Sequence, residues 1–268
     1  MSMRKLGGLL IDLDGTLYHG NTMIDGADRL IRGLERLNLP YLFVTNNSSA
    51  APEAVAERLK SMGIPAEPQH VCTSAQAAAA YICDRYQDGR VFVVGEHGLE
   101  HALLEAGLQV VQEKPNVVVQ GIDRHLTYER LAAAVSHIRS GADYILTNPD
   151  VLLPSDKGFI PGAGSISAML ERASGAEPTV IGKPSAIMMN YALSRIGLPV
   201  EQVWVIGDNP ATDIAAAHAV GCRSALVLTG LATETNYKEL LGRANCHADE
   251  VIGDLHLLLQ RIEQLSSP

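Results

Sequence analysis

Two aspartates, Asp12 and Asp14, are separated by a single residue directly after a short apolar run at 9–11. A run of this kind predicts a buried strand of a parallel sheet, and such strands carry the residues at their carboxyl ends to the ligand crevice. Because side chains alternate along a strand, we expect both carboxylates to point the same way and to repel each other. The pair therefore indicates a cation site or a nucleophile beside a proton carrier, and the plain alternative is two loop acids that cap a turn.

A second polar group follows the apolar run at 41–44. Thr45 and Asn46 open the sequence Thr-Asn-Asn-Ser-Ser, whose hydroxyl, amide and backbone N–H groups suit the oxygens of a phosphate. The simpler alternative is that Ser48 or Ser49 caps a helix that begins near residue 51. The two interpretations are compatible, and the first makes Thr45 and Asn46 candidates for phosphate binding.

Two further motifs supply a cation and more carboxylates. Lys183 stands between a glycine and a proline, which restrict the backbone on either side of this single positive charge. Asp208 follows closely on an apolar run at 203–206, and Asp213 comes at the expected start of a helix. A lone lysine is usually a solvated surface residue, and Asp213 taken alone is a first-turn helix acid. However, Mg²⁺ prefers oxygen ligands, so Asp208 on a neighbouring strand end could complete a metal site with Asp12.

These motifs lie on a chain that alternates short apolar strands with amphipathic helices, and several of them fall at or just after strand ends. Such alternation predicts a mostly parallel sheet flanked by helices. We expect Ser74 to cap one of the helices and Pro184 to lie in the first turn of another. The predicted strands are 9–11, 41–45, 71–73, 91–94, 116–120, 144–147, 203–206 and 224–228, and the predicted helices are 27–38, 51–61, 74–86, 99–105, 128–140, 165–173, 184–196 and 253–265.

The bulk properties of the chain limit its class. Its 268 residues, 47% of them hydrophobic, suit one or two domains with a sizeable core, and its net charge of -9 argues against nucleic acid as a partner. The four cysteines form no CxxC pair, which predicts reduced thiols in a cytoplasmic protein. The first apolar run is too short for a signal peptide or a membrane span, so we expect no membrane association.

In this order and spacing the four motifs resemble those of the haloacid dehalogenase (HAD) superfamily of aspartate-nucleophile phosphohydrolases, across essentially the whole chain. The resemblance implies an α/β fold with a Rossmann-like, mostly parallel sheet core, helices on both faces and an inserted α/β cap domain. It places the core domain at 1–78 and 180–268 and the cap domain at 79–179. Further stretches resemble the NagD-like, p-nitrophenylphosphatase branch of the superfamily, namely 43–48, 120–124, 126–129, 147–150, 161–164 and 227–230.

The resemblance also implies a role for each motif residue. Asp12 attacks phosphorus and forms an aspartyl-phosphate, and Asp14 protonates the leaving oxygen and then activates the water that hydrolyses the intermediate. Thr45 holds a phosphoryl oxygen, and Lys183 balances the charge of nucleophile and phosphate. The implied Mg²⁺ ligands are Asp12, Asp14 through its carbonyl oxygen, Asp208, and Asp213 either directly or through water.

We therefore expect a Mg²⁺-dependent phosphatase acting on a small phosphorylated metabolite, such as a nucleoside monophosphate or a sugar phosphate, in a monomer or homodimer. A dehalogenase uses the same nucleophile but would need no acidic residue at position 14, so Asp14 argues against this class. A phosphomutase usually carries a helical cap just after the first motif, and about thirty residues between Asp14 and Thr45 leave no room for one. A phosphate-ligand sensor would gain little from a repelling acid pair. Branch members that act on pyridoxal phosphate have a histidine where this chain has Leu153, which argues against that substrate.

Overall fold

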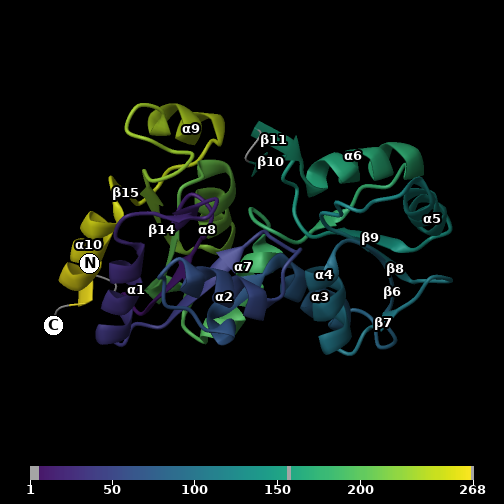
Figure 1. The fold of residues 1–268 in the computed structure, drawn as a ribbon, viewed down its shortest axis with the longest axis horizontal. Coiled ribbons are helices and arrows are strands. Elements are labelled where there is room, and N and C mark those ends of the chain that lie inside the picture. The colour runs from purple at the N-terminus through teal and green to yellow at the C-terminus, as the bar shows by residue number, and fades with distance from the viewer. Residues whose placement is uncertain (1–5, 156–157, 267–268) are drawn as a thin grey trace. The chain divides into compact units, whose positions relative to one another are not determined.

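The computed structural model describes residues 6–155 and 158–266, which divide into two compact units (Figure 1). The core unit holds the described residues up to Thr45, then Val55–Cys72, and those from Lys183 onward. The inserted unit holds Asn46–Ala54 and Thr73–Gly182. Its longer segment contains the residues 79–179 for which the resemblance implies a cap domain.

A six-stranded sheet of order β15-β14-β13-β1-β4-β5 forms the centre of the core unit. β1 lies between β13 and β4 and is parallel to both. All residues of these three strands are buried, as the apolar runs predict for a sheet covered on both faces. The chain fills one side of β1 first and the other side later, so the strand order reverses at β1. The strands are β1 (Gly8–Ile11), β4 (Tyr41–Thr45), β5 (Val71–Thr73), β13 (Val203–Gly207), β14 (Arg223–Val227) and β15 (Glu250–Ile252).

Helices flank this sheet, and their apolar stripes explain where they pack. α1 (Ala27–Arg36) buries Ala27, Leu30, Ile31 and Leu34, the spacing of one helix face, and packs beside α10 (Leu255–Ser266). Other segments of the unit are α2 (Pro52–Ser61), α7 (Ala186–Ile196), α8 (Ala215–Val220), α9 (Tyr237–Arg243), a π-helical turn at Pro210–Ile214, two 3₁₀ turns (Pro68–His70, Val200–Gln202) and a hairpin of β2 (Tyr18–His19) and β3 (Thr22–Met23).

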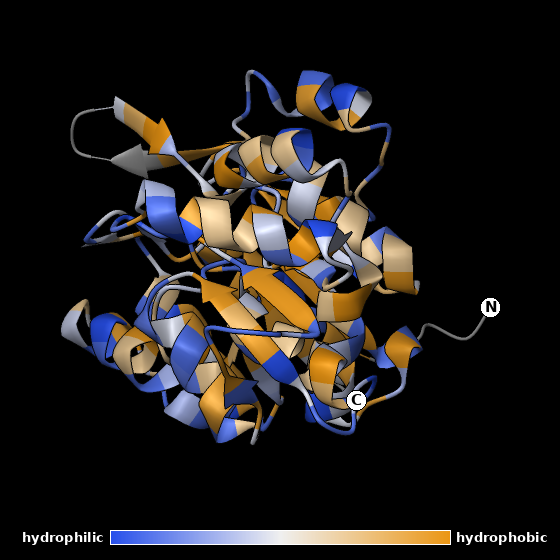
Figure 2. Cartoon of the chain, turned by 90° about the vertical axis from the view of Figure 1, so that its right-hand side faces the viewer, coloured by the Kyte–Doolittle hydropathy of each residue, from blue (hydrophilic) through white to orange (hydrophobic). Residues whose placement is uncertain are grey.

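The inserted unit has its own five-stranded sheet, of order β12-β9-β8-β6-β7, with parallel pairing throughout. Figure 2 shows the hydrophobic character of its strands. The strands and helices are β6 (Arg90–Val94), β7 (Gln109–Val110), β8 (Val117–Gln120), β9 (Asp143–Leu146), β12 (Thr179–Val180), α3 (Ser74–Cys83), α4 (His97–Glu105), α5 (Tyr128–Arg139) and α6 (Ala163–Ser174), with an antiparallel hairpin of β10 (Leu152–Ser155) and β11 (Gly158–Pro161).

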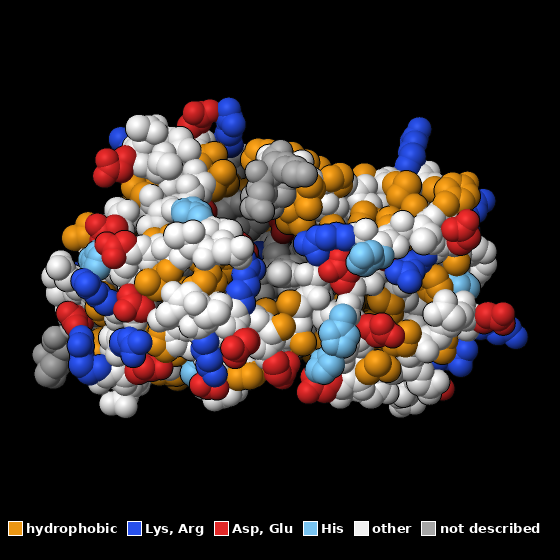
Figure 3. Space-filling model, in the orientation of Figure 1, with side chains coloured by type: hydrophobic (Ala, Val, Ile, Leu, Met, Phe, Trp, Pro, Cys, Tyr) orange, Lys and Arg blue, Asp and Glu red, His pale blue; other side chains and the backbone are white. Residues whose placement is uncertain are grey.

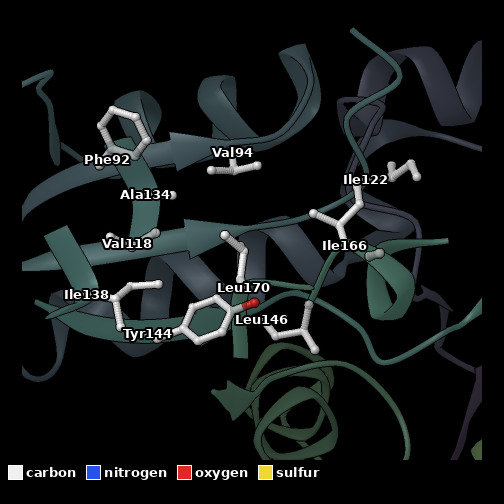
Figure 4. Close-up of a cluster of buried hydrophobic side chains, with 11 residues drawn as sticks. Phe92, Val94, Val118, Ile122, Ala134, Ile138, Tyr144, Leu146, Ile166 and Leu170 are labelled. Carbon is white, nitrogen blue, oxygen red and sulfur yellow. The ribbon is translucent and has the colours of Figure 1, made fainter. Parts of the chain in front are cut away.

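A cluster of buried side chains joins this second sheet to α5 and α6 (Figure 4). Phe92 and Val118 come from the strands, and Ile138 and Leu170 from the two helices. Leu153 of β10 packs against the edge of the cluster. Each unit therefore has a sheet, helices and a core of its own, and the α/β class with parallel sheets and flanking helices is confirmed. Among the residues that the structure describes, no helix combines the length and apolar character needed to cross a membrane.

Several helix starts differ from the expected ones. Ser74 does not cap α3: its hydroxyl donates to the carbonyl oxygen of Asn46 at 2.7 Å, and Thr73 is the N-cap. Pro184 precedes α7, whose N-cap is Ser185, and Asp213 lies in the π-helical turn and not in the first turn of an α-helix. In each case a neighbouring polar side chain forms the cap, which composition alone does not decide.

The start of α3 supports a stability prediction. Thr73 accepts the N–H of Gln76 at 3.2 Å, and the Gln76 side chain accepts the N–H of Thr73 at 3.0 Å, so two otherwise unpaired donors are satisfied. We expect Thr73→Ala to lower the free energy of unfolding by about 1 kcal/mol, measured by urea denaturation. Thr73→Ser keeps the acceptor and is the control. Equal stability of wild type and the alanine variant would contradict the capping role.

Candidate active site

Polar and charged residues lie at the carboxyl ends of adjacent core strands. Asp12 follows β1 directly, and its N–H donates to Ile206 of β13 at 2.8 Å. Asp208 follows β13, and Thr45 is the last residue of β4. Because these three strands are neighbours and parallel, their carboxyl ends lie at one edge of the sheet. This edge, at the point where strand order reverses, is where open α/β sheets bind ligands.

Lys183 lies inside this group and is almost fully buried. Its Nζ atom is 2.5 Å from Asp12 Oδ1 and 2.7 Å from Asp213 Oδ1, and it donates to the carbonyl oxygen of Val44 at 3.0 Å. Burial alone would lower the pKa of Lys183, but the carboxylates of Asp12 and Asp213 outweigh it, and the net pKa is raised well above its usual range. Lys183 is thus a fixed positive charge beside Asp12, and not the solvated surface lysine of the simpler interpretation.

The acids in this group outnumber the lysine. Asp12, Asp208 and Asp213 each offer a carboxylate oxygen, and these oxygens lie within 4.8 Å of one another. Burial, and then the charge of Asp12, raises the pKa of Asp208 and that of Asp213. With three carboxylates and one ammonium, this group has more negative than positive groups in a largely buried environment. The set fits a divalent cation, which prefers oxygen ligands and would relieve the repulsion.

Hydrogen bonds hold these carboxylates in place. The N–H of Leu231 donates to Asp208 Oδ2 at 2.6 Å, and the N–H of Asn209 donates to Asp213 Oδ2 at 3.1 Å. The Thr16 hydroxyl lies 3.2 Å from Asp12 Oδ2 and 3.5 Å from Asp208 Oδ1, so it connects two acids from different strands. Sequence reasoning did not single out Thr16. Its position four residues after Asp12, in a turn that folds back, was the available signal.

Two glycines make room for Asp208. A Cβ atom at Gly15 would lie 2.3 Å from Asp208 Oδ2, and one at Gly230 would lie 2.1 Å from the same oxygen. Gly15 also has a φ of +84°, which favours glycine over residues with a side chain. The loops after β1 and β14 can therefore approach the carboxylate only because both positions lack a side chain.

Asp14 lies at the rim of the group. Its side chain is exposed, and the Tyr18 hydroxyl donates to its Oδ2 at 3.0 Å. The protein atoms packed around the carboxyl, and then the Asp12 carboxylate, raise the pKa of Asp14, although Tyr18 and the positive charges of Arg58 and Lys183 act against this. A raised pKa favours a carboxyl group that can carry a proton.

The structure thus brings Asp12, Lys183, Asp208 and Asp213 together, with Asp14 near Asp12. Thr45 is buried at the end of the neighbouring strand. Asn46 belongs to the inserted unit, where its side chain donates to Asp150 at 3.3 Å.

The serines that follow Asn46 contact residues of the inserted unit. Ser48 is buried and accepts a hydrogen bond from Thr147 at 3.1 Å. The Ser49 hydroxyl donates to Asn47 at 2.8 Å. Polar residues of this segment therefore form contacts within the inserted unit, ahead of the first residue of α2.

Two family models match the chain. One, described as haloacid dehalogenase-like hydrolase, matches residues 9–109, and one described as HAD-hydrolase-like matches residues 180–258. The first match contains Asp12, Asp14 and Thr45, and the second contains Lys183, Asp208 and Asp213. The four motifs therefore fall within the matched segments.

Individual relatives cover nearly the whole chain. The 5'-nucleotidase YutF of Bacillus subtilis is 43% identical to this chain over 85% of this chain and 90% of its own length. The acid sugar phosphatase of Staphylococcus haemolyticus is 44% identical over 88% of this chain and 90% of its own length. Among solved structures, a p-nitrophenyl phosphatase from Archaeoglobus fulgidus has a TM-score of 0.91 at 33% identity, covering 96% of this chain and 99% of its own. A putative p-nitrophenyl phosphatase from Bacillus subtilis has a TM-score of 0.89 at 38% identity, covering 100% of both chains. The chain therefore belongs to the haloacid dehalogenase-like hydrolases, in their NagD-like, p-nitrophenylphosphatase branch, and is a phosphoric monoester hydrolase.

Proposed function

We propose that this chain is a Mg²⁺-dependent phosphatase that hydrolyses small phosphate monoesters through an aspartyl-phosphate intermediate. The observation that carries the proposal is the buried Lys183, held between Asp12 and Asp213 with Asp208 beside them. Phosphoryl transfer needs positioning and charge neutralisation more than elaborate covalent chemistry, and this group supplies both. The relatives named as 5'-nucleotidase and acid sugar phosphatase support nucleoside monophosphates and sugar phosphates as the first substrates to try.

In the first step, a carboxylate oxygen of Asp12 attacks the phosphorus atom. A bond forms between this oxygen and phosphorus while the bond from phosphorus to the ester oxygen breaks, and its electron pair stays on the ester oxygen. Asp14, which starts protonated, gives its proton to that oxygen, and the alcohol leaves. The atoms packed around Asp14, and then the Asp12 carboxylate, raise its pKa, a direction that favours the acid role.

In the second step, a water molecule attacks the phosphorus of the aspartyl-phosphate. The Asp14 carboxylate takes a proton from this water, and the bond between phosphorus and Asp12 breaks with its electron pair returning to the Asp12 oxygen. Inorganic phosphate leaves, and both aspartates regain their starting protonation states. One carboxyl group thus serves as acid and then as base.

The residues around the two acids position the phosphate. Lys183 offsets the negative charge of Asp12, so that an anionic substrate can approach an anionic nucleophile. Thr45 and Asn46 are proposed to bind phosphoryl oxygens through their hydroxyl and amide groups. Thr16 keeps the Asp12 and Asp208 carboxylates in a fixed relation.

The proposed metal ligands are the carboxylates of Asp12 and Asp208 and the backbone carbonyl of Asp14. Asp213, already paired with Lys183, suits a supporting place, directly or through water. When bound, the ion supplies positive charge that offsets the repulsion between phosphate oxygens and carboxylates. Mg²⁺ suits a site that offers a few carboxylates and leaves room for water and phosphate.

The inserted unit is proposed to act as the cap that selects the leaving group. It interrupts the core sequence twice, at Asn46–Ala54 and at Thr73–Gly182, and has a sheet and hydrophobic cluster of its own. Figure 3 shows acidic and basic side chains interspersed over the face that it presents, and the net charge is -9, which supports a small metabolite over nucleic acid as partner. Four unpaired cysteines support a cytoplasmic location, and we propose a monomer or a homodimer.

The test is hydrolysis of p-nitrophenyl phosphate by the whole chain with Mg²⁺ and with EDTA, followed by a panel of nucleoside monophosphates and sugar phosphates. We expect turnover with Mg²⁺ that EDTA removes and added Mg²⁺ restores. Asp208→Asn should raise the Mg²⁺ concentration for half-maximal activity at least about tenfold, because one carboxylate ligand loses its charge. Asp249→Asn is the control, because Asp249 lies at the amino end of β15, where its carboxylate accepts the N–H of Ser224, away from the proposed metal ligands. Full activity in EDTA would contradict the metal-dependent mechanism.

A further inference from the structure

Tyr18 is a buried residue whose polar tip reaches a proposed catalytic acid. Its side chain is 3% exposed, and its hydroxyl donates to Asp14 Oδ2 at 3.0 Å. The backbone between the two residues is a tight turn, since the N–H of Gly15 donates to the carbonyl oxygen of Tyr18 at 2.8 Å and the N–H of Leu17 donates to that of Leu13 at 2.8 Å. The ring and the acid are therefore held by packing and backbone together.

Arg58, on helix α2, contacts the ring of Tyr18. Its guanidinium carbon lies 4.7 Å from the centroid of the Tyr18 ring, within the range of a cation–π contact. Its Nη2 atom also donates to the carbonyl oxygen of Gly20 at 2.6 Å, in the hairpin turn that follows Tyr18. Helix α2 thus fixes both the ring and the hairpin that carries it.

This arrangement leaves the two oxygens of Asp14 with different tasks. Tyr18 occupies Oδ2, and no side chain in residues 6–155 and 158–266 donates to Oδ1. Oδ1 is therefore the oxygen available for a proton, and the hydrogen bond at Oδ2 fixes its direction. An exposed acid without such a contact would rotate among several orientations.

We propose that Tyr18, supported by Arg58, is a positioning residue that orients Asp14 so that Oδ1 faces the leaving-group oxygen. The inference rests on the proposed function, because it takes Asp14 as the acid of the first step. The proton passes from Asp14 to the ester oxygen as the bond from that oxygen to phosphorus breaks, and Tyr18 keeps its own proton throughout. Orientation of a catalytic group contributes directly to the rate of such a transfer.

The proposal predicts a loss of rate that depends on the leaving group. p-Nitrophenol is more acidic than phenol, whose pKa is about 10 as in a tyrosine side chain, so p-nitrophenyl phosphate needs an acid less than phenyl phosphate does. We expect Tyr18→Phe to lower kcat/KM for phenyl phosphate about tenfold more than for p-nitrophenyl phosphate. This parameter reports steps up to the first transfer, so hydrolysis of the intermediate does not enter.

Three comparisons make the test specific. Arg58→Met should shift the ratio of the two kcat/KM values in the same direction as Tyr18→Phe, but by a smaller factor. It replaces Tyr18→Phe as the test variant if Tyr18→Phe does not fold. Tyr41→Phe removes the hydroxyl of a buried tyrosine at the amino end of β4, the end away from Thr45, and should leave the ratio unchanged. Tyr18→Phe added to Asp14→Asn should change the ratio no further, because the partner is already lost.

The outcomes separate two failures. Equal losses on both substrates in Tyr18→Phe, with a leaving-group-dependent loss in Asp14→Asn, would overturn the role of Tyr18 and keep the proposed acid. An unchanged ratio in Asp14→Asn would overturn the acid itself and the positioning role with it. A tenfold shift in both variants, absent from Tyr41→Phe, supports the inference.

Discussion

Asp12→Asn is expected to lower turnover of p-nitrophenyl phosphate by at least about 10⁴-fold, because an amide oxygen is a poor nucleophile toward phosphorus. The substitution keeps the size and shape of the side chain at the end of β1. Contacts to Thr16 and Lys183 can persist in altered form, so the fold should be retained. The loss would therefore report the chemical step and not the assembly of the site.

The measurement pairs steady-state turnover with a search for the intermediate. Wild-type protein mixed with substrate and quenched in acid should carry covalent phosphate, and Asp12→Asn should carry none. Asp28→Asn, in the first turn of α1, is the control and should keep both turnover and phosphorylation. Turnover of Asp12→Asn within tenfold of wild type would contradict the nucleophile assignment.

The sequence predicted the strand edge of the site well, for a physical reason. Apolar runs that end in polar residues are typical of parallel strands at a ligand crevice, and β1, β4 and β13 follow this pattern. Their adjacency places Asp12 and Asp208 together, as the position of each aspartate after an apolar run suggested. The catalytic roles given to these residues stay predictions, since geometry shows proximity and not chemistry.

Contacts between distant parts of the chain were not accessible in the same way. Asp213 was expected near a metal, and the structure shows it paired with Lys183, thirty positions away. The short segment after Asn46 belongs to the inserted unit because Ser48 contacts Thr147 and the carbonyl of Ser49 accepts the N–H of Gly98. No local periodicity encodes such pairs.

Very short elements escaped prediction for a different reason. β2, β3 and β12 have two residues each, too few to show a period of two. The β2–β3 hairpin carries Tyr18, so the residue with the most specific contact to Asp14 lay in a segment without a pattern. Its tight turn depends on backbone hydrogen bonds that the residue types alone do not indicate.

Lys183→Met is expected to have the second largest effect, on activity and stability together. Methionine fills similar space but removes the ammonium that contacts Asp12 and Asp213, so kcat/KM should fall about 10²- to 10³-fold. The buried carboxylate of Asp213 and the partly buried one of Asp12 lose their cation, which should lower the free energy of unfolding of the metal-free protein by about 3–5 kcal/mol at pH 8. Lys60→Met removes an exposed lysine that pairs with Glu67 and should cost under about 1 kcal/mol.

The pH dependence gives this prediction its sign. Asp208 and Asp213 already have raised pKa values in the folded wild type, chiefly through burial, and loss of Lys183 removes a charge that lowers both. Above about pH 4 these acids are ionised in the unfolded chain, so the folded state binds more protons than the unfolded state does. The free energy of unfolding therefore falls as the pH rises. Urea denaturation in EDTA should therefore show Lys183→Met recovering stability between pH 8 and pH 5.5. A variant equally destabilised at both values would mean that lost packing, and not unpaired charge, is the cause.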